Sequence, residues 1–469
     1  MVFKFLTPPR IWADVRILLT LTHVCRSWRD TLINEPQAWA MIFATQQDCR
    51  SFVEMCLERS YPAPLGVKVE ATHFVQSYPS CTCNKDSESR LVPNKIEPCE
   101  WHFVFELLAK PEHSKRIHTL DILYYDCQSN VLSIGETWET AFLVLNCCQF
   151  FKVPYLQLTS LDWKALTWGN DFDFLLPSSL FPPTLRSLSF EGNTGHNQLT
   201  NLSNLTSLAI APPCSRINIG SFKMIIQNNR SLQTLSLNGT HFEGSSSQHP
   251  VTLENLRSFS LRDFHGDSAK ILSTIIHVPA FQCLSSLLFS VERRGISRPC
   301  GWPVLCATGP DIVFSLASSP SRIMGAWQDL IGHPGPTIQH FSFEHQGHFS
   351  PDKSWVGVDG IITLFMDAHT LDISYGCTCG CFAHIYPNFW DDLRKLGPKL
   401  TTIHFKVPKS CLDFSPQHQC DACCERPLDA IEGLIKYRAE HGWLFSSVEG
   451  IFNESEKVDA MQELVWRGL

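Results

Sequence analysis

The clearest feature of the sequence is a recurring triplet of apolar positions with the spacing apolar-x-x-apolar-x-apolar. The last two apolar positions alternate with polar residues, and this alternation predicts a short strand with one buried face. Six well-formed copies occupy the middle of the chain: Leu158-Leu161-Trp163, Leu185-Leu188-Phe190, Leu205-Leu208-Ile210, Leu232-Leu235-Leu237, Leu256-Phe259-Leu261 and Leu284-Leu287-Phe289. Four looser copies flank them: Ile117-Leu120-Ile122, Ile338-Phe341-Phe343, Ala368-Leu371-Ile373 and Leu400-Ile403-Phe405.

The copies recur at a nearly fixed period. Successive central copies begin 27, 20, 27, 24 and 28 residues apart, and the gap from Leu284 to Ile338 spans two such periods. We therefore expect one degenerate unit near Ile312–Leu316. Amphipathic stretches that predict helices lie between copies, at Ser221–Asn228, Asp267–His277 and Asn388–Leu396. This period and pattern resemble leucine-rich repeats, which implies an α/β fold: an irregular solenoid of parallel strands plus helices.

The repeats depart from that family at one position. Leucine-rich repeats usually carry Asn or Cys at the ninth residue, where the side chain satisfies buried loop carbonyls. Here only Asn193 fits, and Leu166, Pro213, Thr240 and Phe264 occupy the position elsewhere. We therefore expect uneven curvature along the array.

The repeat pattern also predicts the residues that point away from the core, onto the concave face of a solenoid. They are Ser187, Ser189 and Glu191, then Ser207 and Ala209, then Thr234, Ser236 and Asn238, then Ser258, Ser260 and Arg262, with Ser286 and Ser290 last. This small, polar and nearly neutral surface suits a protein or peptide partner better than a phosphate backbone. The alternative is that short polar residues simply fit a crowded parallel sheet.

A second pattern lies near the N-terminus. Leu18, Leu21, Cys25, Trp28 and Leu32 follow at spacings of three and four, which predicts one stripe of an amphipathic helix. The residues Asn34-Glu35-Pro36 should end it, because proline disfavours helix in the residue before it.

The string LTHVCRSWRDTLINEPQAWAMI resembles the second half of an F-box, as found in fungal F-box proteins. The matching residues are Val24, Cys25, Arg26, Trp28, Arg29 and Trp39. The resemblance implies that a Skp-type adaptor protein binds here, through Leu18, Leu21, Val24, Cys25, Trp28 and Trp39. The opening Leu-Pro-x-Glu helix of the family has no counterpart, so we expect either an upstream start or a damaged F-box. An ordinary helical hairpin with two core tryptophans is the alternative.

These patterns predict four segments. Residues 1–45 form a partial F-box, and residues 46–115 form a helical linker with a polar, cysteine-containing insertion at 76–100. Residues 116–410 form the repeat region. Residues 411–469 form a C-terminal cap with an amphipathic helix over Leu428–Tyr437.

The charge and composition of the chain narrow the classes of partner that it is expected to bind. The net charge is −8 and the pI is near 6.2, which argues against nucleic acid or an anionic membrane as the main partner. The longest apolar stretch, Ala141–Val153, is too short to cross a bilayer, which needs about 20 apolar residues. We therefore expect an intracellular protein, in cytoplasm or nucleus, with most of its 20 cysteines reduced.

Candidate chemistry is confined to the cysteines, since no catalytic motif is present. Three clusters occur: Cys81-x-Cys83 with Cys99, Cys377-x-Cys379-x-Cys381 with His384, and Cys420-x-x-Cys423-Cys424. Zinc needs four tetrahedral ligands, usually in paired knuckles, and only Cys420 and Cys423 have knuckle spacing. We predict reduced structural cysteines, with no metal and no cofactor, and keep zinc as the alternative.

The resemblance implies a substrate-recognition subunit of a Skp–cullin–F-box ubiquitin ligase. Such a protein catalyses nothing, and its repeats hold a target protein while the F-box, if it is completed upstream, docks on the adaptor. An adaptor-independent repeat scaffold with a degenerate F-box is the second hypothesis, and a zinc-binding protein is the third.

Overall fold

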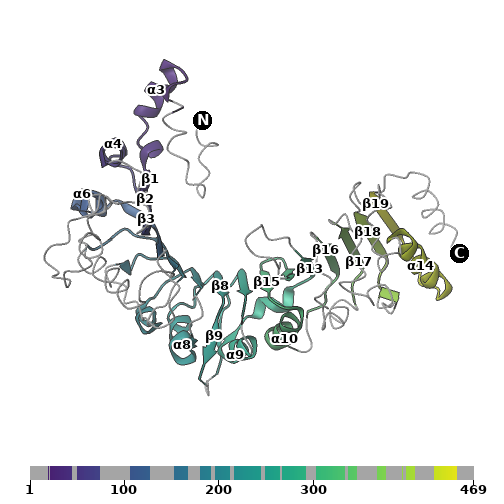
Figure 1. The fold of residues 1–469 in the computed structure, drawn as a ribbon. Helices are drawn as coiled ribbons and strands as arrows, with labels where there is room; N and C mark the ends of the chain where they lie inside the picture. Colours follow the sequence, from purple (N-terminus) through teal and green to yellow (C-terminus); the bar gives the residue numbers. More distant parts are fainter. Residues whose placement is uncertain are drawn as a thin grey trace, which may run out of the picture. The chain divides into compact units, whose positions relative to one another are not determined.

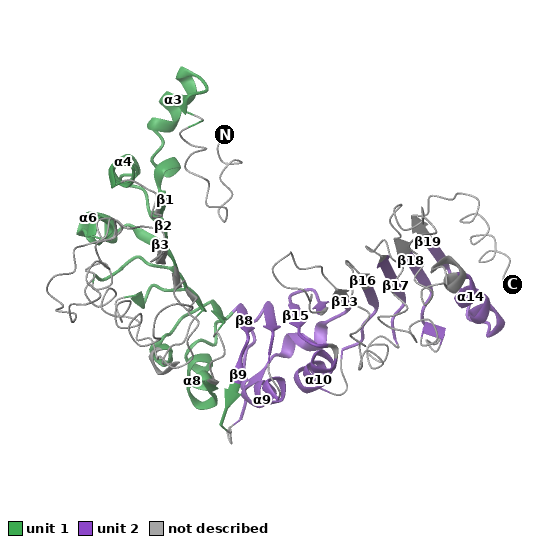
Figure 2. Cartoon of the chain, viewed as in Figure 1, with its two compact units in different colours: residues 1–232, 242–244 green, residues 233–241, 245–469 purple. Residues whose placement is uncertain are grey.

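The computed structural model of the chain describes residues 20, 22–44, 50–73, 106–126, 153–166, 180–191, 196–211, 216–244, 249–264, 267–291, 303–332, 336–345, 367–375, 393–394, 398–406 and 427–451. Contacts divide the chain into two units, coloured separately in Figure 2. Unit 1 comprises residues 1–232 and 242–244, and unit 2 comprises residues 233–241 and 245–469.

Unit 1 is built on a parallel sheet whose described strands follow chain order. They are β1 (Met41–Ala44), β2 (Leu65–His73), β3 (Ile117–Asp126), β4 (Ser160–Leu166), β5 (Ser187–Glu191) and β6 (Ser207–Ile210), and each pairs in parallel with the next. The helices of this unit include α3 (Arg26–Ile33), α4 (Arg50–Arg59), α6 (Pro111–Ser114) and α8 (Ile219–Asn228), with 3-10 turns η1 (Pro36–Trp39) and η6 (His196–Asn201). Figure 1 shows α4 and α6 along one side of β1–β3.

The core of unit 1 comes from every second strand residue. Leu120, Leu161 and Leu188 lie in register on neighbouring strands and are buried. Each such side chain contributes about 1.5–3 kcal/mol when fully buried. The strand register therefore follows from the apolar pattern, since a shift by one residue would expose the whole row.

Two buried polar side chains join successive turns of unit 1. The Asn229 side chain accepts a hydrogen bond from Leu205 N at 2.8 Å and donates to the carbonyls of Leu202 and Ile225. The Arg116 guanidinium donates to the carbonyls of Leu57, Ser60 and Ala63. Asn229 thus does, at one place, what a ninth-position Asn does in each regular repeat. The predicted residue Asn193 lies outside the described residues.

The first strands of the sheet lie much closer to the N-terminus than the repeat pattern predicted. Strand β1 lies within the segment predicted as a partial F-box, and β2 lies within the predicted helical linker 46–115. The prediction missed β2 because Val67 and Val69 alternate with polar residues but lack the leading apolar position of the triplet. The polar insertion at 76–100 lies outside the described residues.

The N-terminal helix is also interrupted where one stripe was predicted. Helix α3 begins at Arg26, because Cys25 is its N-cap: the backbone of Cys25 is extended, and its Sγ accepts a hydrogen bond from Trp28 N at 3.5 Å. Leu18 and Leu21 lie outside the described residues. The single helix from Leu18 to Leu32 was therefore a wrong prediction.

Unit 2 is built on a mostly parallel sheet with one topological irregularity. Its strands are β8 (Thr234–Asn238), β11 (Ser258–Arg262), β13 (Ser286–Val291), β14 (Pro303–Thr308), β15 (Val313–Ala317), β16 (His340–His345), β17 (Thr370–Tyr375), β18 (Thr402–Lys406) and β19 (Ser447–Ile451). Their spatial order is β8-β11-β15-β14-β13-β16-β17-β18-β19. Among the described strands of this sheet, β14 alone runs antiparallel to its neighbours, β13 and β15.

The degenerate unit predicted near Ile312–Leu316 is strand β15, but its place differs from the prediction. It pairs with β11, and the hairpin β14–β15 separates β11 from β13. The hairpin turn depends on Gly309, whose amide donates to Ile312 O at 2.8 Å. A Cβ at this position would lie 2.4 Å from the backbone oxygen of Cys283, so only glycine allows the turn to approach that segment.

Helices cover the buried side of the unit 2 sheet. They are α9 (Ser268–Ile275), α10 (Pro320–Ile331) and α14 (Pro427–Glu440), with the short strands β10 (Val251–Thr252) and β12 (Ile276–His277) and the 3-10 turn η7 (Pro279–Cys283) nearby. Trp327 of α10 packs edge-on against Phe314 of β15, which also stacks on Phe259 of β11. The inserted hairpin is thus tied to its neighbours by an aromatic core.

Of the three helices predicted between repeat copies, the two that fall on described residues are present. Ser221–Asn228 lies within α8, and Asp267–His277 corresponds to α9 followed by β12, while 388–396 lies almost entirely outside the described residues. Helix α14 covers the predicted cap helix, and β19 after it extends the sheet. The fold is α/β, with a large, mostly parallel sheet and several helices.

Candidate functional site

The candidate site is the side of each sheet that faces away from the helices, here named the open face. Its predicted residues alternate with buried ones along β5, β6, β8 and β11. Ser187, Ser189, Glu191, Ser207, Ala209, Thr234, Ser236, Ser258, Ser260 and Ser286 are partly exposed, and Asn238 and Arg262 are exposed. The side chain of Ser290 is not among those described. The pattern therefore placed these residues on the correct side of the sheet.

In unit 1 the open face carries a charged row that the prediction missed. Lys68, Asp121, Asp162 and Ser189 are direct neighbours across β2, β3, β4 and β5. Lys68 Nζ lies 3.7 Å from Asp121 Oδ2 and 5.4 Å from the centre of the Phe43 ring. Two residues further along β4, Lys164 Nζ donates a hydrogen bond to Asp162 Oδ2 at 2.8 Å.

The carboxylates of this row are poorly solvated. Asp121 is only 8% exposed, and the Oδ1 atom of Asp162 is buried with no hydrogen-bond partner among the described residues. Burial raises the pKa of Asp121, and the neighbouring Asp162 raises it further against the opposing effect of Lys68. Burial likewise raises the pKa of Glu191, while Lys164 opposes the change. In the folded state, burial therefore disfavours the ionised forms of Asp121 and Glu191.

This cost can be measured with Asp121→Asn. Because the folded state raises the pKa of Asp121, the carboxyl is destabilising above that pKa, and the amide should be more stable at pH 7. We expect a rise in Tm of about 2–4 °C, the size that ~1 kcal/mol produces in a unit of this length. The gain should fade as the pH approaches the ordinary value of 3.8.

Thermal unfolding at pH 7 and pH 4 checks this, with the exposed Asp311→Asn as control, for which no gain is expected. A lower Tm for Asp121→Asn at pH 7 would show that the ion pair with Lys68 outweighs the burial of the carboxylate.

In unit 2 the open face carries a cluster of His340, Asp372 and His404 on β16, β17 and β18. His340 Nε2 lies 2.7 Å from Asp372 Oδ2, and His404 Nδ1 lies 2.7 Å from Asp372 Oδ1. Ser342 Oγ lies 3.1 Å from the same Nε2 atom of His340. Because Ser342 and Asp372 both lie against Nε2 of His340, this ring lacks the arrangement of a hydrolase triad, in which one ring nitrogen takes the serine proton while the other donates to the carboxylate.

The sequence offered a signal for most of these residues. Asp121, Asp162, Asp372 and His404 each stand between the last two apolar positions of a repeat copy. The same alternation that indicated Ser189 would have placed them on the open face. Lys68 gave no such signal, since β2 carries no complete triplet.

The residues predicted to contact an adaptor differ in how exposed their side chains are. Val24 is 58% exposed, Cys25 is exposed and Trp28 is partly exposed. Trp39, in contrast, is 0% exposed, donates from Nε1 to Leu32 O at 2.7 Å, and has the Arg59 guanidinium over its ring. The side chain of Trp39 therefore belongs to the core of unit 1, and its contact with an adaptor stays a prediction.

The three cysteine clusters, Cys81 with Cys83 and Cys99, Cys377 to Cys381, and Cys420 to Cys424, lie outside the described residues. Within the described ranges, no group of three potential ligands is arranged to hold a metal ion. None of the helices in those ranges is long and apolar enough to cross a membrane.

Comparison with models of known protein families gives no match to this chain, and a search of characterised proteins gives none either.

Proposed function

We propose that this chain is a non-catalytic interaction protein of the leucine-rich-repeat type that binds a partner protein on its open face. The observation that carries the proposal is the charged row of unit 1. Burial raises the pKa of the carboxyls of Asp121 and Glu191, and one carboxylate oxygen of Asp162 is buried with no hydrogen-bond partner among the described residues; small neutral residues would avoid these costs. Destabilising groups of this kind are commonly kept where they serve binding.

The described strands support the same proposal in a second way. The open face of β8 and β11 carries serine, threonine and asparagine with one charged residue, Arg262, and Ser315 Oγ donates to Ser260 Oγ at 3.0 Å across β15 and β11. These short side chains leave the strands accessible. A partner that contacts them would use many modest polar contacts around a few charged residues, as protein interfaces do.

We further propose that the partner is a target protein presented to a Skp–cullin–F-box ubiquitin ligase. Helix α3 and the residues before it support this part, because Val24 is exposed and Trp28 is partly exposed on the segment that resembles an F-box. An adaptor-independent scaffold is the second candidate. The two differ in whether helix α3 binds a Skp-type adaptor.

The open-face proposal is tested by affinity capture with quantitative mass spectrometry. Ser189→Arg and Ser236→Arg each place a long cation on the open face of one unit without touching the core. The matched control is Met224→Arg, which adds the same charge to the exposed side of α8. We expect a specific set of proteins to be retained by the wild type and the control.

At least one open-face variant should lose that set by tenfold or more, with an unchanged unfolding temperature. If both open-face variants retain the same proteins as the control, the partner binds elsewhere and the proposal is wrong.

A further inference from the structure

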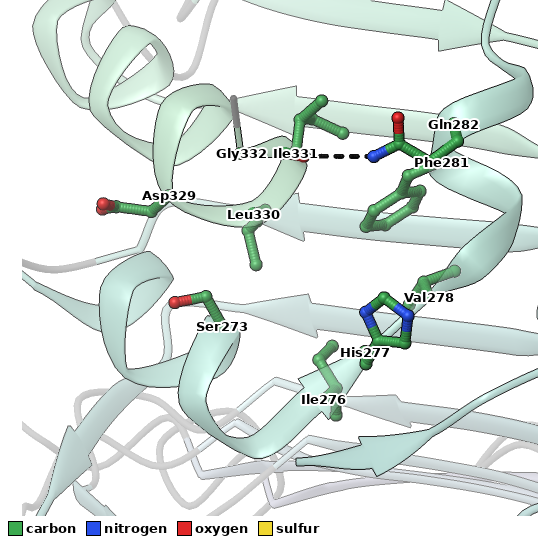
Figure 3. Close-up of a pocket in the computed structure, with 10 residues that line it drawn as sticks. All are labelled: Ser273, Ile276, His277, Val278, Phe281, Gln282, Asp329, Leu330, Ile331 and Gly332. Atoms are coloured by element: carbon green, nitrogen blue, oxygen red, sulfur yellow. Dashed lines mark hydrogen bonds between the residues drawn. The ribbon is translucent and has the colours of Figure 1, made fainter. Parts of the chain in front are cut away.

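Unit 2 contains a small hollow on its helical side, away from the open face. It lies where the C-terminal ends of α9 and α10 meet β12 and η7, and its volume is about 190 Å³. Figure 3 shows Ile276, Phe281 and Leu330 around it, with Ser273 and Asp329 on the side away from Phe281 and the carboxylate of Asp329 pointing outward. Drug-sized ligands occupy about 300–1,000 Å³, so this hollow suits a single side chain.

The electrostatics of the hollow favour a cation. Helices α9 and α10 both end there, at Ile275 and Ile331, and neither has a basic residue in its last turn. Helix C-termini carry partial negative charge from their carbonyl groups. Among the described residues, the carbonyl of Ile331 accepts a long hydrogen bond, 3.5 Å from Gln282 Nε2.

The carboxylate of Asp329 adds a full negative charge beside these carbonyls. Burial raises the pKa of Asp329; Lys270 opposes this change and Asp267 adds to it. The three neighbouring charged groups thus sum to one net negative charge, and the exposed carboxylate of Asp329 is open to a cation from outside the chain.

We propose that this hollow receives an arginine side chain of a partner protein. The methylene stem would pack on Phe281 and Leu330, and the guanidinium would reach Asp329 and the carbonyls at the helix ends. Arginine fits better than lysine because its planar head is more weakly hydrated and offers five donors to several acceptors at once. This contact is independent of the open face and of any adaptor.

Nuclear magnetic resonance of the full chain, labelled at the methyl groups of isoleucine, leucine and valine, tests the proposal. The probe is Nα-acetyl-L-arginine amide, and its neutral isostere Nα-acetyl-L-citrulline amide is the matched compound. The arginine compound should shift the methyl signals of Ile276, Leu330 and Ile331 saturably in the millimolar range. The citrulline compound should bind at least fivefold more weakly.

Two variants separate the charge of the hollow from the net charge of the chain. Asp329→Asn, at an exposed position, should weaken arginine binding at least fivefold with an unchanged methyl spectrum in the absence of probe. Glu254→Gln removes one exposed carboxylate before β11 and should leave binding unchanged. Equal binding of arginine and citrulline, undiminished binding to Asp329→Asn, or tighter binding of Nα-acetyl-L-norleucine amide would each overturn the proposal.

Discussion

Replacing Leu235 with alanine should lower the free energy of unfolding of unit 2 by about 2–5 kcal/mol, the range for truncating a buried leucine. Leu235 is 0% exposed and lies in register with Phe259 on β11. Truncation removes contacts on the helical side of the sheet and leaves a cavity. The flanking strands cannot close this cavity, because hydrogen bonds between the strands hold their backbones in place. Urea denaturation followed by circular dichroism measures the change.

The neighbouring residue provides the control. Ser236 is partly exposed on the open face, so Ser236→Ala should cost less than about 0.5 kcal/mol, as surface changes usually do. The same contrast is expected in unit 1 between Leu208 and Ser207. If Ser236→Ala proved more destabilising than Leu235→Ala, the assignment of the two faces would be reversed.

The strands were predictable because burial alternates along each of them. Leu188 and Phe190, or Leu235 and Leu237, alternate with serine and threonine, and this period of two fixes which side chains are buried. It does not fix strand direction. The apolar pairs Leu305 and Ala307 on β14 and Phe314 and Leu316 on β15 alternate in the same way, yet β14 is antiparallel. Spatial order depends on the close approach at Gly309, which has no periodic signal.

The site was harder to predict than the fold. Asp121 and Asp162 belong to different repeat copies, 41 residues apart, and only the register of β3 against β4 makes them neighbours. Asp121 is buried, and the nearby Asp162 helps to raise its pKa. Neither the burial nor the neighbouring charge can be read from one strand alone. Cys25 illustrates a local failure, since cysteine is not among the usual N-cap residues and the apolar stripe gave no reason to break the helix there.

Replacing Trp39 with alanine should lower the free energy of unfolding of unit 1 by about 3–5 kcal/mol. The indole is fully buried, so its loss leaves a large cavity between η1 and α4. It also leaves the carbonyl of Leu32 without the donor that Trp39 Nε1 provides at 2.7 Å. Denaturant unfolding should show the loss directly. A cost below about 1 kcal/mol would mean that Trp39 is not part of the core.

Trp28→Ala, on the same segment, should have the opposite profile: little effect on stability and a large effect on adaptor binding. Trp28 is partly exposed on α3, so truncation should cost less than about 1 kcal/mol of folding free energy. An exposed tryptophan buried by an adaptor would contribute at least ~1.4 kcal/mol, so titration calorimetry with a Skp-type adaptor should show at least tenfold weaker binding than for the wild type. An affinity that Trp28→Ala leaves unchanged would contradict the adaptor proposal and favour the independent scaffold.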